Sequence, residues 1–205
     1  MVIERAVEWG HPGSRPSDIP VAESDAELAA LVAELRALDP SSPPALSVAA
    51  GDLLHTLGRT PEDATVSRLE HWWYPLDLGW VQTDRGDEIP FVAHVVAHRR
   101  GWRGEAAVVM NAGWFRGLYL GPRAHPNDGL LDVTVGRLGL RQRIEARKRA
   151  GTGTHLPHPM LRTERVPRWE HRFDHPTRVY ADGENIGVTR SLIVRVQTDA
   201  YWAVL

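Results

Sequence analysis

Two carboxylates, Asp128 and Asp132, lie four residues apart where a turn leads into a strand. The preceding Pro126-Asn127-Asp128-Gly129 is typical of a tight turn. Apolar residues then alternate with polar ones, as in a strand with one buried face: Leu131, Val133 and Val135. Carboxylate and backbone oxygens in this arrangement are able to hold a hard cation. The alternative is ordinary turn chemistry, with Asp132 as a solvated strand residue.

A second acidic turn, Asp182-Gly183-Glu184, follows a strand pattern over 178–181 and precedes another over 192–196. Asp-Gly between two strands is the strongest short signal for a hairpin. The functional alternative makes Glu184 a general base that the turn projects into a cleft. Local residues alone favour the hairpin.

His94 and His98 lie four residues apart on a predicted strand, and therefore on one face of it. A zinc site would need at least a third ligand, and metal-binding pairs at this spacing usually lie on a helix. A half-exposed strand face explains the pair equally well. Both interpretations stay open at this stage.

A basic cluster follows the Asp132 strand: Arg137, Arg141, Arg143, Arg147, Lys148 and Arg149. The segment 139–150 is predicted to be a short helix, with Leu140 and Ile144 facing inward. Such clusters are usually solvated faces. The functional alternative is attraction to an anionic membrane surface through Arg141, Arg143, Arg147, Lys148 and Arg149.

Large aromatic residues are concentrated between positions 72 and 115. Most are expected in the core, because a large ring is seldom exposed without a reason. A subset lining a groove for acyl chains is the alternative.

Composition excludes several classes of protein. The chain has 205 residues, a net charge of -2 and no cysteine, so disulfide and thiolate chemistry are absent and wholesale nucleic-acid binding is not expected. No apolar run is long enough to cross a bilayer, and the first ten residues lack a signal-peptide core. We therefore expect a cytoplasmic protein. Peripheral association with the membrane surface is the alternative.

The element pattern predicts an α+β fold, in which a small helical N-terminal remnant (residues 1–60) precedes a β-rich, sandwich-like domain (residues 61–205). Ser24 and Glu27 form a capping box that begins a helix, and Asp39-Pro40 ends it. A short strand and then a helix are expected within 45–57. Strands are predicted at 66–74, 78–83, 88–98, 106–110, from 131 onward, 166–173, 178–181, 192–196 and 201–205.

Three of these segments, in order, resemble motifs of the diacylglycerol kinase and bacterial lipid kinase family, which has an NAD kinase-like fold. Gly121-Pro122-Arg123-Ala124 resembles its A-P-x-A segment, the Asp128–Asp132 segment its D-G-x-L-D, and Asp182-Gly183-Glu184 its D-G-E. The resemblance covers residues 104–205. It implies a structural Mg2+ held by Asp128, Asp132 and the backbone oxygen of Leu130. It also implies a catalytic role for the acidic turn, with Glu184, beside Asp182, taking the proton from a lipid hydroxyl.

The nucleotide side of that family is missing from the sequence. Its members bind ATP through a G-G-D-G-T loop, and no such sequence occurs here. Residues 48–58 look like a degraded form of the family's G-T-x-N-D-x-A-R-x-L-G. The resemblance therefore implies a pseudoenzyme that binds a lipid or amphipathic ligand without catalysing transfer alone. The alternatives are a divergent ATP-dependent lipid kinase and a structural interaction module. Whether the chain self-associates, or a partner protein supplies the nucleotide half, stays open.

Overall fold

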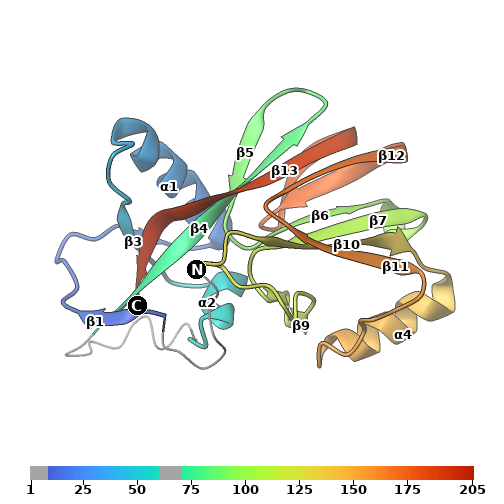
Figure 1. Ribbon diagram of the computed structural model, residues 1–205, viewed down its shortest axis with the longest axis horizontal. Helices are drawn as coiled ribbons and strands as arrows, with labels where there is room; N and C mark the ends of the chain where they lie inside the picture. The colour runs from blue at the N-terminus through green and yellow to red at the C-terminus, as the bar shows by residue number, and fades with distance from the viewer. Residues whose placement is uncertain (1–8, 61–70) are drawn as a thin grey trace.

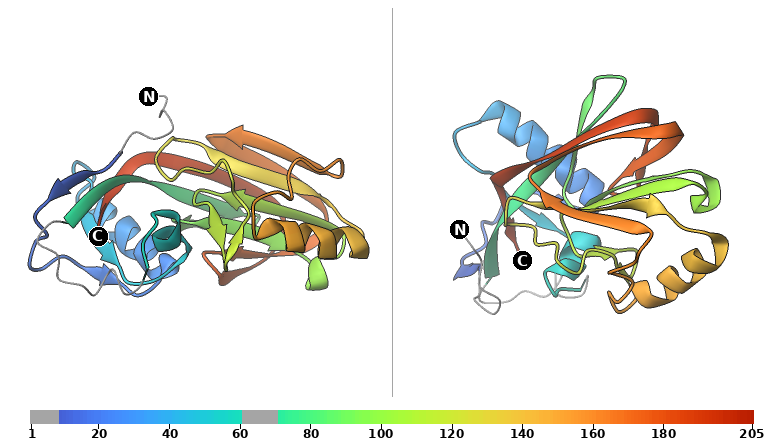
Figure 2. Two further views of the ribbon diagram at one scale, coloured as in Figure 1. Left: turned by 90° about the horizontal axis from the view of Figure 1, so that it is seen from below. Right: turned by 45° about the vertical axis from the view of Figure 1, so that its right-hand side comes forward.

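The computed structural model describes residues 9–60 and 71–205. Most of its strands join one sheet, in the order β1-β4-β13-β12-β6-β7-β10-β11, and this sheet folds over into a β-rich sandwich (Figure 1). The N-terminal helices and helix α4 lie at opposite ends of it (Figure 2). The predicted α+β fold is confirmed.

The N-terminal segment contains β1 (His11–Gly13), β2 (Val21–Ala22), α1 (Asp25–Leu38), β3 (Ala45–Val48) and α2 (Asp52–Thr56). Helix α1 begins as predicted, because the Ser24 hydroxyl accepts the Glu27 N–H at 3.3 Å and the Glu27 carboxylate accepts the Glu23 N–H at 2.8 Å. Strand β3 runs parallel to the end of β13, so this segment shares the sheet with the rest of the chain.

The remaining elements follow in chain order. They are β4 (His71–Thr83), β5 (Glu88–Phe91), β6 (His94–His98), the 3-10 turn η1 (Arg100–Trp102), β7 (Glu105–Met110), β8 (Trp114–Phe115), β9 (Leu118–Tyr119), β10 (Leu131–Arg137), α4 (Leu140–Ala150), β11 (Leu161–Val166), β12 (Arg168–Ala181) and β13 (Glu184–Val204). Residues 66–70 of one predicted strand lie outside the described residues, and so does residue 61, where the second predicted domain begins.

Several predicted strand boundaries were wrong, for identifiable reasons. The predicted strand 88–98 is divided at Val92 and Ala93, whose N–H groups bond to the side chain of Asp182 rather than to a neighbouring strand. The predicted strands 192–196 and 201–205 are one strand, β13, which crosses an irregularity where Asp199 has a φ of +48°. Long pairing with β4 keeps β13 continuous across this defect.

Two apolar clusters form the core. One fills the sandwich between β6, β7 and β10 on one side and β4, β12 and β13 on the other. The other joins α1, β3 and α2 to the first half of β4 and the end of β13. A buried Tyr201 and the fully buried Leu28 and Leu46 belong to this second cluster. Burial of this apolar area is what attaches the N-terminal helices to the sandwich.

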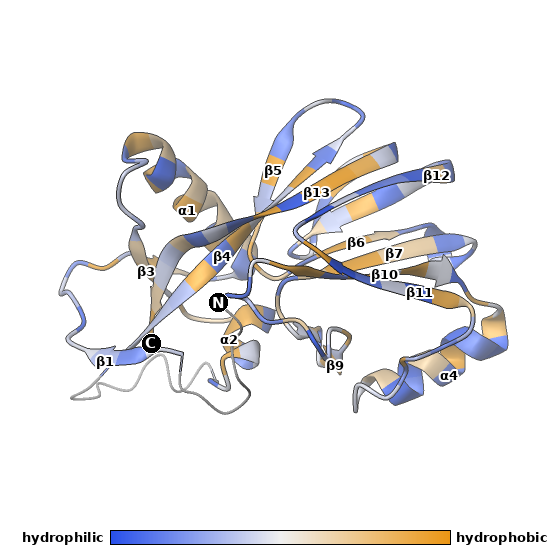
Figure 3. Cartoon of the chain, viewed as in Figure 1, coloured by the Kyte–Doolittle hydropathy of each residue, from blue (hydrophilic) through white to orange (hydrophobic). Residues whose placement is uncertain are grey.

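Helix α4 differs from its prediction in one respect. Leu140 and Ile144, which were expected to face inward, are 67% and 51% exposed. Arg143 and Ala146 are half-buried instead, and Ala150 is buried. The Leu140 and Ile144 side chains line a hollow between α4 and the sandwich rather than a packed face, so they face inward but stay exposed. Hydrophilic and hydrophobic residues alternate along its visible surface (Figure 3).

Candidate functional site

The acidic turn Asp182-Gly183 forms the tight hairpin between β12 and β13. Ala181 pairs with Glu184, and the two turn residues have φ values of +45° and +87°. The Asp182 carboxylate accepts N–H groups from Val92, Ala93 and His94 at 2.7–2.9 Å. Three amides at one carboxylate fix it rigidly.

Burial nevertheless raises the pKa of Asp182, because the nearby His94 and the three amides offset only part of the desolvation. The neighbouring Glu184 begins β13, and its side chain is exposed. Among the described residues it has no side-chain hydrogen bond or ion pair. The hairpin prediction is confirmed, while the catalytic roles of Asp182 and Glu184 stay predictions.

His94 connects this turn to the N-terminal segment. Its Nε2 lies 3.0 Å from Oδ2 of Asp52, the first residue of helix α2. Burial opposes the charged form of His94, but the hydrogen bond to Asp52 and the charge of Asp182 outweigh it, so the pKa of His94 is raised. Burial likewise opposes ionisation of Asp52. The His94 bond and the Arg116 N–H outweigh that burial, so the pKa of Asp52 is lowered. The two groups therefore form an ion pair, whose His94 ring packs edge-on against Phe115.

Asp25 completes this acidic junction, a name we use for Asp25, Asp52, His94 and Asp182. Its carboxylate accepts the N–H groups of Asp52 and Leu53 and so caps helix α2. Burial, followed by the charge of Asp182, raises the pKa of Asp25 to about 7. Sequence reasoning did not identify Asp25, and it considered His94 only as a zinc ligand together with His98. Asp52 was detectable, because it lies in the degraded motif at 48–58.

An apolar groove of about 690 Å3 extends from Gly183 and Arg116, which adjoin the acidic junction, to helix α4. Its floor is one face of four strands, its walls are the β8–β9 hairpin and the turn after β6, and its roof is α4. The residues that line it include Val96, His98, Trp102, Ala106, Val108, Phe115, Arg116, Leu118, Leu120, Thr134, Leu140, Ile144, Tyr180 and Gly183. We refer to it as the α4 groove.

His98 is the centre of an aromatic stack in this groove. The Trp102 ring lies parallel to the His98 ring with centroids 4.4 Å apart, and the Tyr180 ring also stacks on His98, with centroids 5.4 Å apart. His94 and His98 thus contact different partners, Asp52 and Trp102. Among residues 9–60 and 71–205, no group of three or more His, Cys, Asp or Glu side chains is arranged to hold a metal. His155 also lines the groove, and burial lowers its pKa.

Asp128 and Asp132 form a separate cluster. Asp128 accepts the Leu130 N–H at 2.9 Å and forms an ion pair with Arg165. Asp132 is 5% exposed, and its Oδ1 lies 3.5 Å from Nε of Arg165 and 3.6 Å from Nη2 of Arg123. Burial raises the pKa of both carboxyls, offset in part by these arginines. Their role as metal ligands stays a prediction.

Comparisons with known proteins agree with this fold. A family model described as the YegS C-terminal NAD kinase beta sandwich-like domain matches residues 86–200. Two crystal structures from Bacillus anthracis strain Sterne, assigned as diacylglycerol kinases, align over 91% of this chain and 77% of theirs, with 13% identity and TM-scores of 0.63 and 0.61. A third, of a diacylglycerol kinase from the same strain, aligns over 78% of this chain and 66% of its own with a TM-score of 0.52 and 13% identity. No curated protein gives a significant match.

Proposed function

We propose that this chain, which belongs to the family of YegS C-terminal NAD kinase beta sandwich-like domains, is a lipid-kinase-like protein. Its ligand would be an amphipathic lipid that carries a hydroxyl group. The apolar part of the ligand would occupy the α4 groove, and its hydroxyl end would face the acidic junction. The shape and lining of the groove carry this proposal. Without a nucleotide loop, the chain would hold its ligand rather than phosphorylate it alone.

The α4 groove has the size and character of a site for an extended apolar ligand. Its volume of about 690 Å3 lies within the usual range of ligand pockets, and its floor is formed by small and branched side chains such as Val96, Ala106 and Val108. A second hollow of about 530 Å3 has charged side chains at five of its twelve lining positions, among them Glu105, Glu164 and Glu170. An acyl chain gains about 0.8 kcal/mol for each buried methylene, so it favours the first.

The polar end of the groove supports a hydroxyl head group. Gly183 and Arg116 line it, and the Arg116 backbone N–H donates to the Asp52 carboxylate at 2.9 Å. The Asp52 side chain keeps 19% of its surface exposed, so it retains acceptor capacity. A hydroxyl donates to such a carboxylate and accepts from a guanidinium, whereas a hydrocarbon end would leave both unpaired.

A binding assay with a fluorescent lipid tests the groove directly. Binding of a fluorescent long-chain monoacyl or diacylglycerol probe to the purified chain should fall about tenfold or more in Val108→Trp, because the indole fills space that about two methylenes would occupy. Val188→Trp, at an exposed position that does not line the groove, is the matched control. Equal affinity of both variants and the unchanged chain would refute the groove as the ligand site.

The divergent-kinase alternative rests on the His94–Asp52 pair, a histidine–carboxylate arrangement of the kind that accepts protons in catalysis. Isothermal titration calorimetry with ATP and Mg2+ separates it from the proposal. We expect no heat of binding at two temperatures, because phosphoryl transfer depends on a phosphate-binding loop. Micromolar binding would favour the kinase and direct attention to an unrecognised loop.

We further propose an anionic membrane surface as the source of the ligand. Arg141, Arg147, Lys148 and Arg149 are exposed on α4, beside the exposed Leu140 and Ile144 at the rim of the groove. Each basic residue near such a surface contributes about 1 kcal/mol. Cosedimentation with phosphatidylserine vesicles should exceed that with phosphatidylcholine vesicles, and Arg147→Gln with Lys148→Gln should reduce it. Equal binding to both vesicle types would exclude the electrostatic part.

No helix in the described part of the chain is long and apolar enough to span a membrane.

A further inference from the structure

The Asp128 turn contains its own cations. Two carboxylates, Asp128 and Asp132, face two guanidinium groups, those of Arg165 and Arg123. Arg165 reaches both carboxylates, since Nη2 pairs with Asp128 while Nε lies 3.5 Å from Oδ1 of Asp132. The formal charges of these four side chains cancel. A third carboxyl, Asp77, accepts the Gly129 N–H at 2.8 Å, and burial raises its pKa to about 6. The arginines therefore balance the two carboxylates that they face.

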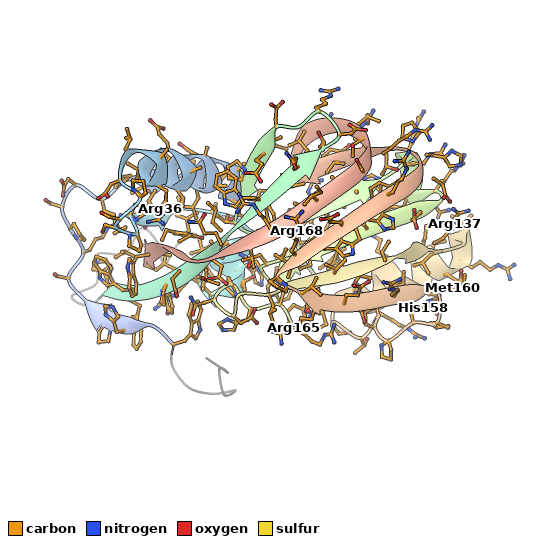
Figure 4. All side chains as sticks on the ribbon, turned by 45° about the horizontal axis from the view of Figure 1, so that its top comes forward. Arg36, Arg137, His158, Met160, Arg165 and Arg168 are labelled. Atoms are coloured by element: carbon orange, nitrogen blue, oxygen red, sulfur yellow. The ribbon has the colours of Figure 1, made fainter. Side chains whose placement is uncertain are left out.

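Strand pairing determines where Arg165 lies. Strands β10 and β11 pair over six residue positions, and Arg165 is the residue directly opposite Asp132. Side chains opposite each other on adjacent strands project from the same face about 5 Å apart. Arg165, labelled in Figure 4, projects from the end of β11 next to the turn. Its guanidinium is thus delivered to the carboxylates by the backbone register.

These carboxylates do not fit a magnesium ion in this arrangement. Mg2+ needs near-octahedral oxygen ligands at about 2.0–2.1 Å. One oxygen of Asp128 accepts the Leu130 N–H, and the other pairs with Arg165. The remaining buried acceptor, Oδ1 of Asp132, faces two guanidinium groups and has no hydrogen bond. A dication at this position would lie against Arg165 and compete with it for the same oxygens.

We infer that Arg165 takes the place of the structural magnesium ion that the family resemblance implies, so that an internal guanidinium holds the Asp128 turn against β10. The Asp132 oxygen without a hydrogen bond is the acceptor that a solution cation would use once Arg165 is removed. The Asp128 turn is thus stable without a metal ion because of one side chain, that of Arg165. This inference does not depend on the proposed ligand.

Thermal unfolding of the full chain tests the inference. The melting temperature of the unchanged protein should be the same in EDTA, in MgCl2 and in CaCl2. Arg165→Met should lower it by about 2–6 °C in EDTA, since this loss corresponds to one strong ion pair in a chain of this size. Mg2+ or Ca2+ should then restore part of the loss. Arg162→Met, on the same strand and with an exposed side chain, should show neither the loss in EDTA nor the recovery with Mg2+ or Ca2+.

Arg165→Lys keeps a cation but loses the planar fork, so we expect a small loss of melting temperature and no metal response. This variant also serves if Arg165→Met does not fold. In the double variant Arg165→Met, Asp128→Asn the rescue by Mg2+ should disappear. A fall in the melting temperature of the unchanged protein in EDTA, reversed by Mg2+, would overturn the inference. So would an Arg165→Met protein as stable as the original.

Discussion

The acidic junction and the Asp128 turn are both clusters of partly or fully buried carboxylates, but they are neutralised differently. In the Asp128 turn, Arg165 and Arg123 face the two carboxylates. In the acidic junction, backbone N–H groups and His94 hold the carboxylates. Within the described residues, no arginine or lysine side chain forms an ion pair with Asp25, Asp52 or Asp182.

This difference separates a structural cluster from a titratable one. A guanidinium stays charged at every physiological pH, so it favours the ionised form of the carboxylates beside it and offsets part of the rise in pKa that burial causes at Asp128 and Asp132. Backbone amides carry no net charge, and His94 is itself titratable, with a pKa raised above its ordinary value. The pKa of Asp25 is raised to about 7. The charge of the acidic junction therefore depends on pH.

The largest expected difference between the two regions comes from their glycines. Gly51 has a φ of +141°, and a Cβ atom there would lie 2.1 Å from Oδ1 of Asp25. Gly129, in the Asp128 turn, has a φ of +70° and would place a Cβ 3.0 Å from a methyl group of Thr198. We expect Gly51→Ala to lower the free energy of unfolding by about 4 kcal/mol or to prevent folding, and Gly129→Ala by about 1–2 kcal/mol.

Urea denaturation followed by tryptophan fluorescence measures both variants. If Gly51→Ala does not fold, Asp25→Ala combined with Gly51→Ala should recover soluble protein, because the clash is with the Asp25 side chain. Equal losses in Gly51→Ala and Gly129→Ala would show that left-handed backbone strain alone, rather than the cap at α2, sets the cost.

The second prediction concerns pH. Asp25 has an ordinary pKa of 3.8 and about 7 when folded, so the folded state binds its proton more tightly than the unfolded chain. The stability that this proton provides is present at acid pH and is lost as pH rises from about 4 to about 7. His94, with a raised pKa, adds a loss of the same sign above pH 6.5. We expect the free energy of unfolding to fall by about 2–4 kcal/mol over the Asp25 window.

Urea denaturation at pH 4, pH 7 and pH 8 checks this expectation. Asp25→Asn should reduce the dependence between pH 4 and pH 7, because the amide does not ionise and its oxygen still accepts the Asp52 N–H. Asp77, whose pKa burial raises to about 6, should keep part of it. The loss from His94 should remain. Asp18→Asn, at an exposed position, is the control. A pH dependence that is unchanged in Asp25→Asn would show that Asp25 is not the titrating group.

The sequence predicted those features that depend on neighbours in the chain. Helix α1 was predicted from Ser24 and Glu27 at its start and Asp39-Pro40 at its end, and the β12–β13 hairpin from Asp182-Gly183. Strand β11 was missed because its alternation, Leu161 to Val166, lies on an edge strand with mostly exposed and half-buried side chains. The family motifs located the sandwich without specifying its connections.

The acidic junction was only partly predictable, because it is assembled by contacts between distant residues. Asp25 caps α2 from 27 positions away, and His94 pairs with Asp52 across 42. The role of Asp182 in dividing β5 from β6 depends on amides about 90 positions earlier. Arg165 is equally invisible, since only the register of β10 with β11 brings it opposite Asp132. A single sequence contains no local signal for such pairings.

The smallest expected difference is in the response to salt, and it sharpens the comparison. The Arg165 side chain is 38% exposed, so its pairing with Asp128 should be partly screened, whereas His94 and Asp52 are 3% and 19% exposed. Coupling energies from double-mutant cycles, Arg165→Met with Asp128→Asn and His94→Gln with Asp52→Asn, measure the two pairs separately. Between 0.05 M and 1 M NaCl we expect the first coupling to fall by about 0.5 kcal/mol and the second to change less. If the His94–Asp52 coupling fell more steeply, the acidic junction would be open to ions in solution. The proton affinity of its groups would then depend on the salt concentration of the buffer rather than on the surrounding protein. The distinction between a fixed and a titratable cluster would fail.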